Sequence, residues 1–267
     1  MKNFILFFLT IFLLNFTNLN ANISINSKYL LFDDKTRNND LTVINASSEP
    51  HTYKISFIYY KQNADGSYVP NNDISLIESS KYLKITPRQF TLKPSESQVI
   101  RIQKTSMADS PDKEYDMHML IKEQPEEVPP SDLKIEKNED LEIKIKPLFA
   151  VSFPVIVRKG KLEANNSITE TNFFVEDNII KLKVKISREG NRSSRGDLIL
   201  KNNKDVVAKA DGVNIFLSNN LREFTLNIGS TDDADLVEKL TQPLTLLYQD
   251  SFNKKNILAK TDLSYKK

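Results

Sequence analysis

The sequence predicts an all-β protein of two domains that follow an N-terminal export signal. Three observations lead to this prediction: an apolar leader, many short runs of alternating apolar and polar residues, and no long amphipathic helix. Short β-rich runs separated by clusters of Pro, Asn, Asp and Ser are typical of antiparallel sandwiches and barrels. The chain has 267 residues, which is enough for two domains of about 100–150 residues each.

The leader comprises residues 1–21, MKNFILFFLTIFLLNFTNLNA. It begins with a positive charge at Lys2, continues with an apolar run and ends at the small residue Ala21, as secretory signal peptides do. The apolar run is shorter than the roughly 20 residues of a membrane-spanning helix, so a retained anchor is the less favoured alternative. We therefore expect cleavage after Ala21 and export to a bacterial periplasm.

Several runs in the first half predict strands. They are residues 23–32, 41–44, 53–59, 82–85, 98–102 and 115–121. Residues 122–140, KEQPEEVPPSDLKIEKNED, contain three Pro and seven acidic residues. Such a composition favours a loop over packed structure.

The strand expected after this loop is the most informative segment. Residues 141–157 read LEIKIKPLFAVSFPVIV, and side chains of one parity share one face of a strand. One such face carries Phe149, Val151, Phe153, Val155 and Val157. The other face is mostly apolar too, so a strand buried on both faces is one interpretation. Pro154 instead favours an edge strand with its missing N–H on the unpaired side, and an apolar edge needs a cover from the fold or from a partner.

The second half predicts another set of strands. The runs are residues 178–187, 197–200, 205–208, 213–217, 223–228 and 243–248, with a short helical turn at 233–240. Turn residues near 157–161 separate the halves. The expected domains are therefore residues 22–157 and 158–267.

Composition excludes several classes of function. The 37 Lys and Arg nearly balance the 35 Asp and Glu, for a net charge of +2, unlike the basic excess of most nucleic-acid-binding proteins. The chain has no Cys and only two His, which excludes disulfides, Cys-ligated metals and a three-His site. The six Gly form no nucleotide-binding loop. We expect no cofactor, no metal and no enzymatic activity.

Short segments in a specific order then match a known family. They are LTVIN (41–45), ITPRQFTLKP (85–94), QVIRI (98–102), FPVIVR (153–158) and SREGNRSSRGDL (187–198). On these segments the chain resembles the PapD-like periplasmic chaperones of the chaperone–usher pathway. The ending FPVIVR is closer to the archaic, or σ-type, branch.

The resemblance implies two immunoglobulin-like sandwiches set at an angle. It also implies a chaperone that binds pilus or fimbrial subunits and delivers them to an outer-membrane usher. Residues 148–157 match the strand that such chaperones lend to the subunit. In that case Phe149, Val151, Phe153, Val155 and Val157 would fill the subunit's groove. A self-capping dimer of the free chaperone is an alternative that the sequence leaves open.

The resemblance is incomplete at one site. The better-known branch holds the subunit's C-terminal carboxylate with an Arg and a Lys, but Tyr29 and Pro154 stand near those positions. Neither side chain can form an ion pair. Lys28, Arg88 and Arg158 are the candidate substitutes, whereas Arg101 and Glu114 are expected to form ion pairs or turn contacts within the fold.

Two other classes of function fit the sequence less well. An exported structural or adhesive β-sandwich protein, such as a pilus component, would need an incomplete domain and a free extension, yet strand-like sequence follows the leader closely. The tripeptide Arg195-Gly196-Asp197 lies in the family's turn, which favours a structural role over adhesion. A secreted glycosidase would need paired carboxylates, and no cluster of acidic residues resembles such a site.

Overall fold

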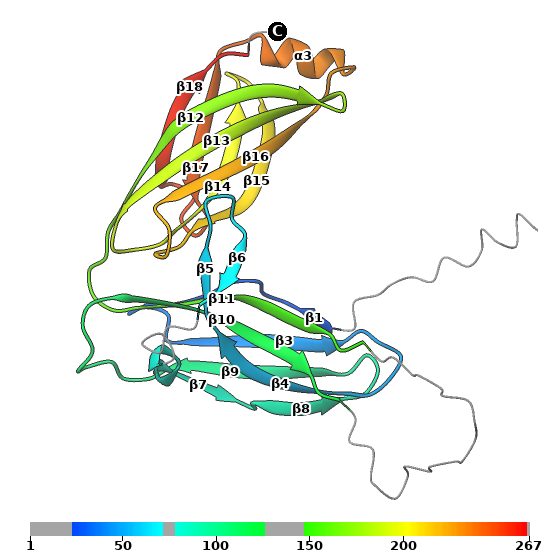
Figure 1. Ribbon diagram of the computed structural model, residues 1–267, viewed down its shortest axis with the longest axis vertical. Helices are drawn as coiled ribbons and strands as arrows, with labels where there is room; N and C mark the ends of the chain where they lie inside the picture. The colour runs from blue at the N-terminus through cyan, green and yellow to red at the C-terminus, as the bar shows by residue number, and fades with distance from the viewer. Residues whose placement is uncertain (1–22, 72–77, 126–146, 266–267) are drawn as a thin grey trace, which may run out of the picture.

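The computed structural model describes residues 23–71, 78–125 and 147–265 (Figure 1). Within these ranges the chain forms eighteen strands, one 3-10 helix and one short α-helix. The strands pack into two sandwiches, one from each half of the chain. The prediction of an all-β, two-domain fold is confirmed. The expected signal peptide, residues 1–21, lies outside the described residues, as does most of the acidic segment 122–140.

Two sheets form the N-terminal sandwich. The first contains, in spatial order, β1 (Ile23–Ile25), β3 (Asn38–Asn45), β9 (Ser97–Lys104) and β7 (Leu83–Thr86). The second contains β2 (Leu30–Phe32), β11 (Ala150–Arg158), β10 (Glu114–Glu123), β4 (His51–Ile58) and β8 (Gln89–Leu92). A 3-10 helix, η1 (Glu78–Tyr82), precedes β7.

The alternation in sequence explains the N-terminal core. Met117, Met119 and Ile121 of β10 are at most 1% exposed, because residues of one parity face the opposite sheet. Leu41 and Val43 of β3 meet them from that sheet and are fully buried. The run 115–121, whose Met content is also compatible with a helix, is therefore a strand in a sandwich core.

A hairpin of β5 (Tyr60–Gln62) and β6 (Tyr68–Pro70) leaves the N-terminal sandwich and reaches the C-terminal one (Figure 1). Gln62 Oε1 accepts a hydrogen bond from the Phe216 backbone N–H at 3.1 Å. The carbonyl oxygen of Ala64 accepts one from the Glu223 N–H at 2.7 Å. These bonds fasten the hairpin to the second domain.

The C-terminal sandwich also has two sheets. One contains β12 (Ala164–Glu176), β13 (Ile179–Gly190) and β16 (Leu221–Ser230). The other contains β15 (Val206–Ile215), β14 (Ser194–Lys201), β17 (Leu244–Asp250) and β18 (Ile257–Leu263). The expected helical turn is α3 (Ala234–Leu240), whose N-cap Asp233 accepts a hydrogen bond from the Leu236 N–H.

Two details of the C-terminal half differ from the sequence prediction. Residues 205–208 and 213–217 belong largely to one strand, β15, which continues through an irregular register at Gly212, where φ is +68°. The long strand β12 was not predicted at all. None of its thirteen residues is buried, so it lacks the apolar alternation on which strand prediction depends.

Candidate partner-binding edge

Strand β11 is paired on one side along its whole length but only partly on the other. Its residues Ala150–Arg158 pair with β10 in antiparallel register. On the opposite side β2 pairs with Val155–Val157 in parallel register. Among the described strands, none covers the remaining side of Ala150–Pro154. We call this stretch the open edge.

The backbone of the open edge is directed away from β10 at every second residue. The Glu123 N–H donates to the carbonyl oxygen of Phe149 at 2.9 Å, so Phe149 faces β10. Because hydrogen-bonding direction alternates along an antiparallel strand, Ala150, Ser152 and Pro154 direct their backbone groups to the other side. Pro154 therefore removes no donor from the β10 ladder, as the sequence predicted. The structure adds that β2, not β11, is the outermost strand of the sheet.

The side chains of β11 correct the expected donor set. Phe153 is 2% exposed, and Val155 and Val157 are fully buried in the core of their own domain. These three side chains cannot enter a partner without leaving that core, because the same parity that aligns them points them at the opposite sheet. Only Phe149 and Val151 of the expected five remain half-buried.

The other parity carries the more accessible side chains. Leu148 is 41% exposed, and Ala150 and Ser152 are exposed. The open edge and the two residues before it, Leu148 and Phe149, thus combine unpaired backbone groups with apolar surface on both faces.

Arg158 does not serve as an accessible anchor. Its Nε lies 2.7 Å from Oε2 of Glu114, whose side chain is fully buried. Glu114 Oε1 accepts the backbone N–H of Ser193 in the second domain at 2.9 Å, and an Arg158 guanidinium N–H donates to the Ser193 carbonyl at 3.1 Å. Arg158 and Glu114 therefore join the two domains. The expectation that Glu114 forms an ion pair within the fold is confirmed, as it is for Arg101, which pairs with Asp40.

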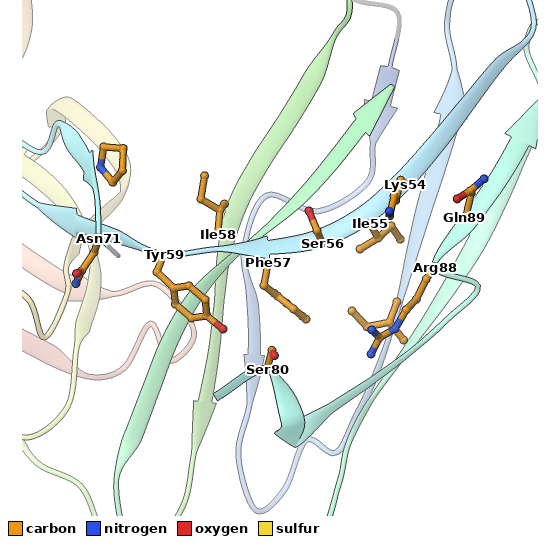
Figure 2. A pocket seen from close by; sticks show the side chains of 12 residues that line it. Lys54, Ile55, Ser56, Phe57, Ile58, Tyr59, Asn71, Ser80, Arg88 and Gln89 are labelled. Atoms are coloured by element: carbon orange, nitrogen blue, oxygen red, sulfur yellow. The ribbon is translucent and has the colours of Figure 1, made fainter. Parts of the chain in front are cut away.

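Arg88 lies on a different side of the domain from the open edge. It lines a trough of about 660 Å³ together with Ile55 and Phe57 of β4 and Ser80 of η1. Figure 2 shows Phe57 pointing from β4 towards Ser80, with Arg88 further along the same side. Strand β10 separates β4 from β11, so Arg88 is not beside the open edge.

Lys28 is the candidate cation that the fold brings nearest to the open edge. It is exposed and precedes Leu30, the residue of β2 that pairs with Val155. The three candidates are therefore not gathered into one site. The structure leaves Lys28 at the edge, Arg88 in the trough and Arg158 in the domain interface.

Aromatic and titratable side chains fill the junction of the two domains. The Arg195 guanidinium lies 4.6 Å from the ring centroid of Tyr29, and burial raises the Tyr29 pKa well above its usual range. His118 packs edge-on against the rings of Tyr60 and Tyr68, each with centroids 4.9 Å away, and burial lowers its pKa to about 4. Burial, followed by the nearby Glu114 carboxylate, raises the pKa of Asp116 to about 6.

The tripeptide Arg195-Gly196-Asp197 has a structural role. Asp197 is 2% exposed and accepts hydrogen bonds from the Gly212 N–H at 3.0 Å and the Ser251 hydroxyl at 2.7 Å. Burial opposes its ionisation, but these bonds and the ion pair with Lys254 prevail and lower its pKa to about 2. A carboxylate held in this way is not presented for adhesion.

No group of three or more His, Asp or Glu in the described residues could hold a metal ion. None of the helices described is long and apolar enough to cross a membrane.

Similarity to known proteins was found only among solved structures. No protein-family model matches the sequence, and no curated protein matches it. A crystal structure of the YadV chaperone is similar over 91% of this chain and 100% of its own, with 10% identity and a TM-score of 0.44. The CsuC–CsuE chaperone–tip subunit complex of Acinetobacter baumannii gives 13% identity, coverages of 91% and 99%, and a TM-score of 0.44.

The Salmonella enterica SafA pilin–SafB chaperone complex gives 14% identity, coverages of 93% and 99%, and a TM-score of 0.41. Each of these three structures contains a chaperone, and the CsuC–CsuE complex belongs to an archaic chaperone–usher pilus system.

Proposed function

We propose that this protein is a periplasmic chaperone that holds pilus or fimbrial subunits by adding the open edge of β11 to an incomplete subunit sheet. Delivery of the bound subunit to an outer-membrane usher completes the proposed role, which requires no cofactor and no catalysis. The observation that carries the proposal is the open edge itself, where Ala150–Pro154 has a strand partner on one side only among the described residues.

The energetics favour a strand as the ligand. An added strand would bond the backbone groups of Ala150 and Ser152, and each such bond contributes a net of about 0.5–1.5 kcal/mol. Strand addition is the mode by which pilus chaperones are known to hold subunits. Covering the exposed parts of Leu148, Phe149 and Val151 adds up to about 1.5–3 kcal/mol for each large side chain that becomes fully buried. Ordering both partners offsets part of this gain.

The geometry also limits where the added strand can lie. It would occupy the position that β2 would fill if β2 began before Leu30. Its end nearest β2 would then approach Lys28, which makes Lys28 the remaining candidate for an ionic contact with the subunit. Arg88 and Arg158 are not part of this proposal.

A proline substitution tests the open edge directly. Ser152→Pro removes one backbone N–H on the open side and none on the β10 side, so the free protein should unfold at nearly the same temperature. Co-expression with candidate pilus subunits, followed by pull-down and size exclusion, should show loss of the one-to-one complex. Ser152→Ala keeps the N–H and should capture subunits normally.

Two results would contradict the proposal. Undiminished capture by Ser152→Pro would exclude strand addition at this edge. Self-polymerisation of the purified wild-type protein, without capture of any subunit, would favour a pilus component instead.

A further inference from the structure

A buried carboxylate fastens the start of β11. Glu123, the last residue of β10, is 1% exposed. Its backbone N–H donates to the Phe149 carbonyl at 2.9 Å. Its Oε2 accepts the Phe149 N–H at 3.3 Å. One residue therefore bonds both backbone groups of Phe149.

This arrangement replaces the normal end of a strand ladder. In an antiparallel pair, the N–H of Phe149 would bond the main-chain carbonyl of the residue opposite, and the register places Glu123 opposite Phe149. Here the side-chain carboxylate takes the place of that carbonyl. Phe149 is thus held to β10 although it lies just before the first residue of β11.

His51 completes the cluster from a third strand. Its Nδ1 lies 2.7 Å from Glu123 Oε1, and the two side chains are 7% and 2% exposed. A buried carboxylate is costly unless donors surround it, and here His51 and Phe149 supply donors to different oxygens. The cluster ties the first residue of β4, the last residue of β10 and the entry of β11 together.

We propose that Glu123 and His51 are positioning residues of the subunit-binding edge. By fixing Phe149, they set the register in which Leu148, Ala150 and Ser152 are presented to an incoming strand. This inference rests on the proposed function, and it assigns to a buried His–Glu contact the task of preorganising the site. A preformed edge binds more tightly because less ordering remains to be done on binding.

Amide hydrogen exchange of the full mature chain tests the positioning without any subunit. Glu123→Leu should speed exchange of the Phe149 amide about tenfold, because a charge-assisted bond is lost, while the Met119 amide changes little. Glu123→Gln retains an acceptor for Phe149 and a polar group for His51, so it should restore most of the protection. Val43→Ala, a core variant on the opposite sheet, controls for a general loss of stability.

Subunit capture is then measured on the same variants. Glu123→Leu should weaken capture about tenfold and Glu123→Gln should rescue it. His51→Phe, which keeps a ring of similar size but no donor, should give a smaller effect in the same direction and serves as the second variant if Glu123→Leu does not fold.

Each outcome bears on a different step. If the Phe149 amide exchanges at the wild-type rate in both Glu123→Leu and His51→Phe, these residues do not hold Phe149 to β10. Faster exchange with unchanged capture overturns the positioning role, while strand addition stands if Ser152→Pro abolishes capture. If the wild-type chain captures no subunit, both the proposed function and this inference fail.

Discussion

The two halves of β11 differ in what holds them. Ala150–Pro154 is bonded to β10 alone and has exposed side chains at Ala150 and Ser152. Val155–Arg158 lies between β10 and β2, and its first three residues are fully buried. The carbonyl of Arg158 additionally accepts a bond from the buried Lys104 ammonium. Among the described strands, one half of β11 thus has a strand on one side only, while its other half is anchored in the fold on both sides.

Truncating a β11 side chain that is buried in the N-terminal core should have the largest effect on stability. Phe153→Ala is expected to lower the free energy of unfolding by about 3–5 kcal/mol, because it leaves a cavity in a close-packed core. Urea unfolding of the purified protein measures this change. Phe149→Ala, in a half-buried side chain outside that core, should cost only about 1 kcal/mol. Equal losses for the two variants would remove the distinction between the core-facing Phe153 and the half-buried Phe149 just before β11.

Breaking the ion pair at the end of the anchored half should rank next. Glu114→Ala leaves Arg158 and the Ser193 N–H without their acceptor. Removing one partner of a buried pair costs about 3 kcal/mol, here partly in the contact between the domains. Calorimetry of this variant should show the two domains unfolding in separate transitions, where the wild type shows one. A single transition at the wild-type temperature would argue against this role of Glu114.

The stability of the protein should depend on pH through Asp116, which pairs with Ile156 in the anchored half of β11. Burial is the main reason that the pKa of Asp116 in the folded protein, about 6, lies above the usual value of 3.8. The neutral form is therefore the one that the fold favours. Its contribution is fully present below pH 3.8 and is lost as the pH rises through 6, on the order of 1–3 kcal/mol.

Urea unfolding at pH 5 and pH 7.5 checks this dependence. Asp116→Asn should flatten the difference between the two pH values. The charges near Asp116 are Glu114 on its own strand, Lys113 just before that strand and Arg188 on β13. All three are kept unchanged in the comparison. A pH dependence that persists in Asp116→Asn would assign it to another group.

Replacing Leu148, which lies just before β11, should have the smallest effect on stability. Leu148→Ser changes a side chain that is 41% exposed, and surface substitutions usually alter stability by no more than about 0.5 kcal/mol. The same variant should weaken subunit capture several-fold if the open edge binds the subunit. Val99→Ser on β9, a residue that is 48% exposed on the other sheet, is the matched control and should leave capture intact.

Much of the fold could be predicted from alternation alone. The pattern at 98–102 correctly located β9, because every second side chain there must enter the core. The same rule showed that Phe149 and Val157 share a face. It could not show whether that face packs against the opposite sheet or against a partner. The answer depends on where the opposite sheet lies, and that is fixed by residues far away in the chain.

The long-range contacts around β11 could not be predicted from alternation in the sequence. Arg158 and Glu114 are 44 positions apart, and His51 is further still from Glu123. No local pattern relates residues at such distances, so an Arg at a strand end could be taken for a ligand-binding residue. A hint was present in Glu123 itself, an acidic residue two positions after the apolar run 115–121 and at the start of a Pro-rich segment.

Pro154 has one more consequence, which concerns the length of a partner's strand. Its ring leaves no N–H on the side that an added strand would approach, and β2 takes over at the next residue. If a partner strand adds to the open edge as proposed, it would have to end or bend at Pro154. Pro154 would then favour partners whose exposed segment ends at this position over partners whose segment is longer.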